Sequence, residues 1–324
     1  MRSRTTTPAD DAPPEPETET VAVNIPDAAD LPTPEAFAEP APAPAVSVTA
    51  GLSGIRIGII GAGAMGSSLC RGLANSGAIP ANKIVVYDPH PPHTQALNES
   101  LKVKVAENAV QIAKYTDIIL LCVKPYNVGV VLAEISESLE RAEGKPLPLI
   151  ISIAAGVKIE KIEGHLPSNL PVIRAMPNTP AQVGLGACAY CVGTHANANH
   201  AAQADLIFRS VGTAVQVPES MMDAVTALSG SGPAYIYLMI EALIDGGVKV
   251  GLPRDIATQL AAQTALGAAQ MVIETKKHPA VLRDMVTTPA GTTIAAISSL
   301  EQSGVRAALI DAVERAAIRS KELG

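Results

Sequence analysis

Three glycines between an aliphatic run and an amphipathic stretch constrain the fold of this chain more than any other feature. Gly61, Gly63 and Gly66 follow the run IRIGII at residues 55–60 and open residues 64–75, which have helical periodicity. In such a context the first glycine permits a tight turn, the second lets the backbone approach a pyrophosphate, and the third lets the helix pack closely on the strand. Free N–H groups at the start of the helix favour phosphate charge. The pattern predicts a dinucleotide-binding loop.

Short aliphatic runs then alternate with helical stretches up to about residue 217. The runs KIVVY, DIILLCV and PLIISI, at residues 83–87, 117–123 and 148–153, are rich in β-branched residues and nearly without polar side chains. Strands buried on both faces of a parallel sheet have this composition. The alternation predicts an α/β fold, with a Rossmann-type doubly wound parallel sheet over residues 53–217.

The strand signal disappears after residue 217, and an all-α C-terminal domain is expected over residues 218–324. Residues 234–252 are apolar on nearly all sides of the expected helix, so other helices must bury it. We expect a second subunit to supply them in a homodimer, and a monomer in analytical ultracentrifugation would contradict this. The expected helices cover residues 221–227, 233–250, 254–277, 278–286, 292–300 and 305–323.

The first 52 residues have the composition of a disordered tail. Residues 1–50 hold ten of the 26 prolines, nine acidic residues and two arginines, so the tail accounts for the formal charge of −7. An import peptide is usually basic and poor in acids, so we expect a cytoplasmic protein rather than an organellar one. No apolar run approaches the length of a membrane span, about twenty residues, and we expect no membrane partner.

Nucleic acid and metal are not expected as ligands. Aromatic residues make up 2% of the chain, which disfavours stacking on bases. Cys188 and Cys191 form a CxxC followed by His195 and His200, but this spacing does not fit an ordinary structural zinc site. Their segment alternates like a strand, which would point the two thiols to opposite faces.

Residues after the expected strands should face the dinucleotide, because ligands of open α/β sheets lie outside the carboxyl ends of the strands. Asp88 ends the second strand, where an acidic side chain binds a ribose 2′-hydroxyl and repels a 2′-phosphate. No arginine follows it, which favours NADH, although His90 and His93 could contact a phosphate when protonated. Lys124, after the strand at 117–123, is equally compatible with a solvated loop lysine.

Four motifs resemble the pyrroline-5-carboxylate reductase family from about residue 55 to the end of the chain. They are MPNTPAQVG at 176–184, MDAVTALSGSGP at 222–233, the adjoining AYIYLMIEALIDGGVKVGLP at 234–253, and HPAVLRDMVTTPAGTTI at 278–294. The resemblance implies reduction of a cyclic imine to proline with NADPH or NADH. It also implies a Rossmann domain, an interlocking helical domain, a substrate site at the dimer interface and, in many members, a decamer.

The resemblance also implies site residues. Thr293 matches the threonine that hydrogen-bonds the substrate ring nitrogen. The implied substrate loop further contains Thr288, Gly291 and Thr292. The implied cofactor residues are Ile60, Gly61, Ala62, Gly63, Ala64, Met65, Gly66, Asp88, Asn108, Cys122, Val123, Lys124, Pro125, Ala154, Ala155 and Gly156.

Three positions depart from the family pattern. Ala290 stands where the family usually has a second glycine, and we expect it to be tolerated only with a negative φ. Met285 replaces a polar residue near the substrate in some members, which puts that contact in doubt. Lys276 stands where an acidic residue contacts the substrate in some members, and we do not assign that contact to Lys276.

The residues of the loop are compatible with this assignment but do not require it. Pro289 and Gly291 precede an apolar helix, whose first N–H groups could bind a carboxylate. Thr292 could equally be a simple helix cap. Thr293 would donate a hydrogen bond to the imine nitrogen or orient a water toward it. Because a hydroxyl is a weak acid, solvent would supply the proton.

Two alternative functions differ in class. A β-hydroxyacid dehydrogenase would need a lysine on the long interdomain helix, whereas Lys249 lies near the end of its helical run, past two glycines. A non-catalytic dinucleotide sensor would keep the glycine loop and lose the substrate loop, which is intact here. An assay with pyrroline-5-carboxylate, NADH and NADPH separates the three.

Overall fold

The computed structural model describes residue 52, residues 54–139 and residues 146–324. The expected disordered tail therefore lies, apart from Leu52, outside the described residues. Leu52 is fully buried in the core of the sheet domain.

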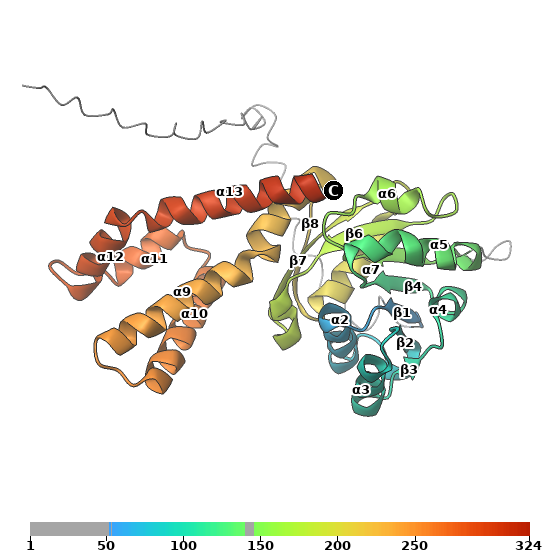
Figure 1. Cartoon of the computed structure of the whole chain (residues 1–324), viewed down its shortest axis with the longest axis horizontal. Helices are drawn as coiled ribbons and strands as arrows, with labels where there is room; N and C mark the ends of the chain where they lie inside the picture. The colour runs from blue at the N-terminus through green and yellow to red at the C-terminus, as the bar shows by residue number, and fades with distance from the viewer. Residues whose placement is uncertain (1–51, 53, 140–145) are drawn as a thin grey trace, which may run out of the picture. The chain divides into compact units, whose positions relative to one another are not determined.

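Within the described residues, eight strands form one sheet in the order β3-β2-β1-β4-β5-β6-β7-β8 (Figure 1). The first six strands are parallel, and their order is the one typical of dinucleotide-binding sheets. β7 is antiparallel to β6, and β8 is parallel to β7. The strands are β1 (Ile57–Ile60), β2 (Ile84–Tyr87), β3 (Lys104–Val105), β4 (Ile118–Leu121), β5 (Leu149–Ser152), β6 (Val172–Met176), β7 (Gly186–Val192) and β8 (Gly212–Gln216).

Helices cover both faces of this sheet, as expected. Neighbouring residues of β4 belong to different cores: Leu120 packs in one cluster with α2, α3 and α7, and Leu121 in the other with α4, α5 and α6. Strand side chains alternate between faces, so a strand covered on both sides is apolar at every position. The helices of this region are α2 (Ala64–Asn75), α3 (Pro91–Leu101), α4 (Ala109–Tyr115), α5 (Val128–Leu139), α6 (Ile159–Glu163) and α7 (Ala198–Arg209), with short 3₁₀ turns η2 (Ala81–Lys83), η3 (Pro125–Asn127), η4 (Thr179–Val183) and η5 (Glu219–Met221).

After β8 the described chain is entirely helical, as predicted. A π-helical turn, η6 (Thr226–Gly230), precedes the apolar helix α9 (Gly232–Lys249), and Ser231 N donates to Thr226 O across the turn. The last helix returns to the start of this region, where Ser320 Oγ donates to Asp223 Oδ1 at 2.6 Å. The helices are α8 (Met222–Val225), α9 (Gly232–Lys249), α10 (Arg254–Thr275), α11 (Pro279–Met285), α12 (Thr292–Gln302) and α13 (Val305–Leu323).

One helical stretch, Glu219–Lys249, is long and apolar enough to cross a membrane by length and composition. The expectation that no run approaches such a length is therefore wrong by this measure. The stretch also contains small and polar residues and four carboxylates, those of Glu219, Asp223, Glu241 and Asp245. Only 11% of its most apolar window is buried inside the described chain. Most side chains of this window are therefore not buried within the single chain.

Candidate functional site

The glycine loop forms a cradle that only glycine can build. Gly61 has a φ of +99°, and a Cβ there would lie 2.6 Å from the carbonyl oxygen of Cys122. A Cβ on Gly66 would lie 1.9 Å from Gly61 O, so α2 can approach the loop only at a glycine. A Cβ on Gly63 would meet nothing within 4 Å, which leaves open space above the N-terminus of α2. This combination fits a dinucleotide pyrophosphate.

The structure brings the predicted cofactor segments to one edge of the sheet. Cys122 N donates to Ile60 O and Gly61 N to Tyr87 O, both at 2.8 Å, so the ends of β1, β2 and β4 are joined directly. The segment after β5 contains Ala154, which is buried, and Gly156, which has a φ of +74°. The remaining predicted residues of this edge are Ala62, Ala64, Met65, Asn108, Val123, Lys124, Pro125 and Ala155.

The Asp88 carboxylate is attached to the glycine loop as well as placed near the expected ribose. Its side chain is 9% exposed, and Oδ2 accepts from Ala62 N at 2.7 Å while Oδ1 accepts from His90 N at 2.8 Å. Burial alone would raise the pKa of Asp88, but these backbone N–H groups and the nearby His93 hold it below the usual value. The sequence correctly predicted Asp88 directly after β2, but it did not predict the hydrogen bond by which Asp88 fixes the glycine loop.

Two other predicted cofactor residues also have local structural roles. Asn108 is the N-cap of α4, and its Oδ1 accepts from Gln111 N at 2.9 Å. Burial raises the pKa of the Cys122 thiol above the ordinary value, which disfavours the nucleophilic thiolate. Lys124 is exposed and precedes η3, so both of its readings remain open.

The two cysteines of the CxxC lie on opposite faces of the sheet, as predicted. Cys188 packs in the core beside α2 and Cys191 in the core beside α5. Burial raises the pKa of both thiols, that of Cys191 to about 12. Among residues 52, 54–139 and 146–324, no group of three or more His, Cys, Asp or Glu side chains could hold a metal ion.

The predicted substrate loop joins α11 to α12 through a tight turn. Gly291 N donates to Thr288 O at 3.0 Å, with Pro289 and Ala290 between them. Ala290 has a φ of +56°, so the expectation of a negative φ at this residue is wrong. A proline at the second position and a positive φ at the third are the features of a type II turn, which ordinarily takes glycine at the third.

The first turn of α12 presents its backbone N–H groups without a side-chain cap. The N-cap is Gly291, with no side-chain capping bond, and Thr292 and Thr293 are the first two helical residues. The alternative that Thr292 simply caps the helix is therefore wrong. Thr293 is half-buried, while Thr288 and Thr292 are exposed. The turn can accept an anion beside three hydroxyl groups.

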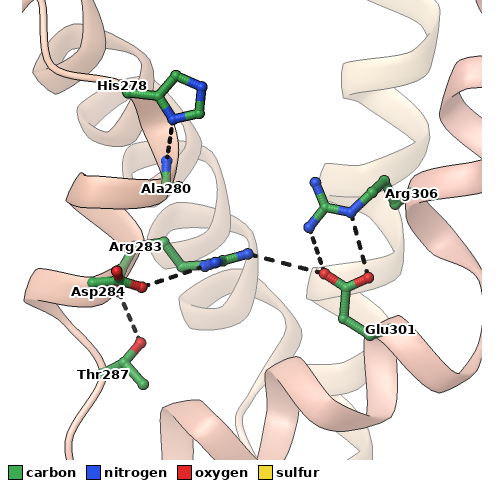
Figure 2. A network of polar contacts seen from close by, with 7 residues as sticks. All are labelled: His278, Ala280, Arg283, Asp284, Thr287, Glu301 and Arg306. Atoms are coloured by element: carbon green, nitrogen blue, oxygen red, sulfur yellow. Dashed lines mark hydrogen bonds and ion pairs between the residues drawn. The ribbon is translucent and has the colours of Figure 1, made fainter.

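An ion-pair network fixes the elements on both sides of this loop (Figure 2). Arg306 of α13 forms a bidentate pair with Glu301 of α12, and Arg283 Nη1 of α11 lies 3.9 Å from the same carboxylate. Hydrogen bonds from Arg306 lower the pKa of Glu301. Just beyond the end of α11, Thr287 Oγ1 donates to Arg283 O at 2.7 Å. Sequence reasoning missed this network, since no local pattern shows that these three helices meet.

A second missed contact joins two of the motifs. Asn178 is 9% exposed, and its Nδ2 donates to Ser229 O at 3.0 Å while its Oδ1 accepts from Ala187 N at 2.8 Å. A Cβ on Gly230 would lie 2.5 Å from the Met176 Cε. The loop after β6 is therefore fitted to the π-helical turn η6, and the sequence signal for it was the small-residue run SGSG.

The helices on either side of the substrate loop pack against other C-terminal helices, whereas the glycine loop lies at the sheet. The main packing partner of α11 is α10, and that of α12 is α13. Meanwhile α9 and α10 expose large apolar side chains that would be buried in a stable assembly. The most exposed of these are Tyr237, Leu238, Leu243, Leu260 and Ile273.

Comparison with known proteins identifies relatives of both halves. The family described as pyrroline-5-carboxylate reductase dimerisation matches residues 219–323, and the family described as NADP oxidoreductase coenzyme F420-dependent matches residues 56–156. Pyrroline-5-carboxylate reductase from Synechocystis sp. is 45% identical over 270 residues, covering 83% of this chain and 98% of the relative. The Arabidopsis thaliana enzyme is 43% identical over 268 residues, covering 83% and 95%.

Solved structures agree with these relatives. The pyrroline-5-carboxylate reductase of Coxiella burnetii superposes with a TM-score of 0.78 at 35% identity, covering 83% of this chain and 98% of the other. The Plasmodium falciparum pyrroline carboxylate reductase, solved with NADP bound, gives a TM-score of 0.74 at 35% identity, covering 84% and 98%. The resemblance predicted from the four motifs is confirmed.

Proposed function

The chain belongs to the pyrroline-5-carboxylate reductase family, and from this premise we propose that it reduces pyrroline-5-carboxylate to L-proline, the last step of proline biosynthesis. The observation that carries the proposal is the loop between α11 and α12. It holds Thr288, Thr292 and Thr293 around an uncapped helix N-terminus, within the part of the chain that matches the family's dimerisation domain. The substrate is an anion with an imine nitrogen, and the loop offers donors for both groups.

The glycine cradle and the neighbouring strand ends would hold a nicotinamide dinucleotide. Gly63 leaves room for the pyrophosphate, and Asp88 stands at the ribose end. When bound, the nicotinamide supplies the hydride that forms the new C–H bond at the imine carbon. Addition to the C=N bond places an electron pair on nitrogen, which takes one proton to give the secondary amine of proline.

The chain's own groups contribute placement more than acid–base chemistry. The N–H groups at the start of α12 bind the substrate carboxylate and orient the ring. The Thr293 hydroxyl donates to the ring nitrogen or orients a water toward it. Because a threonine hydroxyl is a weak acid, the proton comes from solvent. We assign no part in the chemistry to the thiol of Cys122, whose pKa is raised by burial.

A steady-state assay of pyrroline-5-carboxylate with NADH and with NADPH tests the proposal. We expect saturable oxidation of the dinucleotide and formation of one proline per dinucleotide consumed. Dinucleotide binding without turnover would contradict this and favour a sensor. Turnover of a β-hydroxyacid in place of the imine would favour the dehydrogenase alternative.

Thr293→Ala tests the site assignment. Loss of one hydrogen bond to the reacting nitrogen should lower kcat about tenfold or more, with dinucleotide affinity unchanged. The matched control is Thr287→Ala in the same loop, because its hydroxyl bonds Arg283 O and is not assigned to substrate. Equal kcat values for the wild type and Thr293→Ala would remove Thr293 from the mechanism.

We further propose a homodimer as the smallest complete unit, with association of dimers into a decamer. The exposed apolar side chains of α9 and α10 support the dimer, because an obligate interface resembles a domain core cut in half. The partner would bring its substrate loop to the cofactor edge. Sedimentation velocity at micromolar concentration tests both states, and a monomer that turns over substrate would contradict the proposal.

Two further proposals concern the preferred dinucleotide and the cellular compartment of the enzyme. Asp88 at the ribose position favours NADH at neutral pH, and the ratio of kcat/KM for NADH and NADPH measures it. The acidic composition of residues 1–50 supports a cytoplasmic enzyme, and cell fractionation with an antibody against the folded domain tests this.

A further inference from the structure

Two histidines lie over the carboxylate at the ribose end of the cofactor edge. Nδ1 of His90 is 3.3 Å and Nδ1 of His93 is 3.4 Å from Asp88 Oδ1, and the two ring centroids are 5.8 Å apart. The carboxylate is 9% exposed, whereas the imidazoles are 77% and 50% exposed. With Nδ1 facing the carboxylate, Nε2 of each ring remains for a ligand.

The backbone of this turn offers little to a phosphate. Helix α3 begins with Pro91 and Pro92, which have no N–H groups, and the next N–H, that of His93, donates to His90 O at 3.1 Å. The hydroxyl of Thr94 is buried and donates to Pro91 O. Within residues 88–94, the side chains that could donate to a 2′-phosphate are therefore the two imidazoles.

Other charged groups lie in the C-terminal half of α3 or on the elements around it. On α2, Arg71 Nη1 donates to Ser100 Oγ in the last turn of α3. Glu107, which follows β3, accepts from Gln111. The remaining charged residues of this region are Glu99 of α3, Lys102 at its C-cap, Lys104 of β3, and Lys83 of η2, which packs against β3. The charge that faces Asp88 thus changes only with the imidazoles.

We propose that the protonation of His90 and His93 selects between NADH and NADPH. With neutral imidazoles, the Asp88 charge favours a ribose 2′-hydroxyl and repels a 2′-phosphate. With protonated imidazoles, two positive charges outweigh the carboxylate, and Nε2–H groups donate to the phosphate in charge-assisted hydrogen bonds. The enzyme therefore uses NADH at alkaline pH and accepts NADPH as the pH falls. This inference rests on the proposed function, because it needs a dinucleotide at this edge.

The sign of the effect follows from which groups change charge. The backbone hydrogen bonds that lower the pKa of Asp88 keep it ionised throughout pH 6.0–8.5. Histidine is the side chain whose charge ordinarily changes in this range. A phosphate monoester also gains charge above a pKa of about 6, but that change is the same for every variant. A difference between wild type and a histidine variant therefore isolates the imidazoles.

The test measures binding rather than turnover. NADH and NADPH are titrated into the full chain at pH 6.0, 7.0 and 8.5, with nicotinamide fluorescence as the readout. The ratio of Kd for NADPH to Kd for NADH should rise about tenfold or more between pH 6.0 and 8.5. In His90→Gln/His93→Gln the ratio should lose most of this rise and stay high, while NADH affinity changes less than about twofold. His195→Gln, at an exposed histidine of the loop after β7, is the matched control and should behave as wild type.

Two results would overturn the inference in distinguishable ways. If both dinucleotides bind and the double variant keeps the wild-type pH profile, the histidines do not select and the proposed function stands. If neither dinucleotide binds at any pH, the proposed function fails and the inference with it. Circular dichroism of the double variant verifies that both exposed substitutions leave the fold intact.

Discussion

At two adjacent residues of the substrate loop, removing one methyl group should stabilise the protein and adding one should destabilise it. Ala290 has a φ of +56°, where the Cβ of any residue but glycine crowds a carbonyl at about 1–2 kcal/mol. Glycine relieves this strain but brings about 0.4–1 kcal/mol of extra chain entropy to the unfolded state. We therefore expect Ala290→Gly to stabilise the protein by about 0.5–1 kcal/mol.

The reverse change at the next residue should be harmful. A Cβ on Gly291 would lie 2.3 Å from Thr288 Oγ1 and 3.1 Å from Thr288 O. Rotation of the hydroxyl relieves the shorter contact but moves a group assigned to the substrate. We expect Gly291→Ala to cost about 1–3 kcal/mol, as overpacking does, and to raise KM for the imine.

Thermal unfolding at one fixed protein concentration measures both effects. A stabilisation near 1 kcal/mol corresponds to a Tm increase of about 2–4 °C for a domain of this size, and kcat should change less than about twofold for Ala290→Gly. Ala295→Gly, in the regular part of α12, is the control and should lower Tm because glycine weakens a helix interior by about 1 kcal/mol. If Ala290→Gly lowers Tm as Ala295→Gly does, the turn assignment is refuted.

Three further predictions follow from single contacts. Gly66→Ala should lower Tm and weaken the binding of both dinucleotides, because its Cβ would lie 1.9 Å from Gly61 O. Gly63→Ala should weaken dinucleotide binding and leave Tm unchanged, since its Cβ would meet no protein atom within 4 Å. Fluorescence titration and thermal unfolding distinguish the two variants. Glu301→Gln should loosen both arginine contacts and raise KM for the imine without changing dinucleotide Kd; a changed Kd would contradict a local role. Asp88→Asn should be less stable than wild type at pH 7, and the difference should shrink as pH falls from about 4, because a carboxyl with a lowered pKa loses its contribution on protonation. Urea titrations at pH 7, 5 and 3.5 measure this, and a constant difference would refute it.

The parts of the fold that were predictable depend on local rules. The glycine loop follows from backbone geometry at Gly61 and Gly66, and buried strands follow from the uninterrupted aliphatic runs. The reversed direction of β7 and β8 could not be predicted in the same way. The connection at 177–185 is shorter than the dozen or so residues that a parallel crossover needs, so the antiparallel pairing of β7 with β6 follows only once the bounds of both strands are known.

The sequence predicted where the site residues lie along the chain, but not which residues they contact. Asp88 was expected after β2, yet its bond to Ala62 N depends on the loop of a neighbouring strand. The positive φ of Ala290 depends on the turn closed by Thr288 and Gly291. A single sequence shows an alanine in that place and gives no sign of the strain that it carries.

The cofactor site and the substrate loop should respond differently to dissociation of the dimer. The cofactor edge lies within one sheet, so a change at Gly63 acts in each subunit alone. The substrate loop is held by α11, α12 and α13, and their neighbours α9 and α10 expose apolar side chains. If a partner covers those side chains, dissociation removes the imine site while the glycine cradle persists. Dilution below the dimer Kd should therefore abolish turnover before it abolishes NADH binding, and loss of both together would place the whole site within one chain.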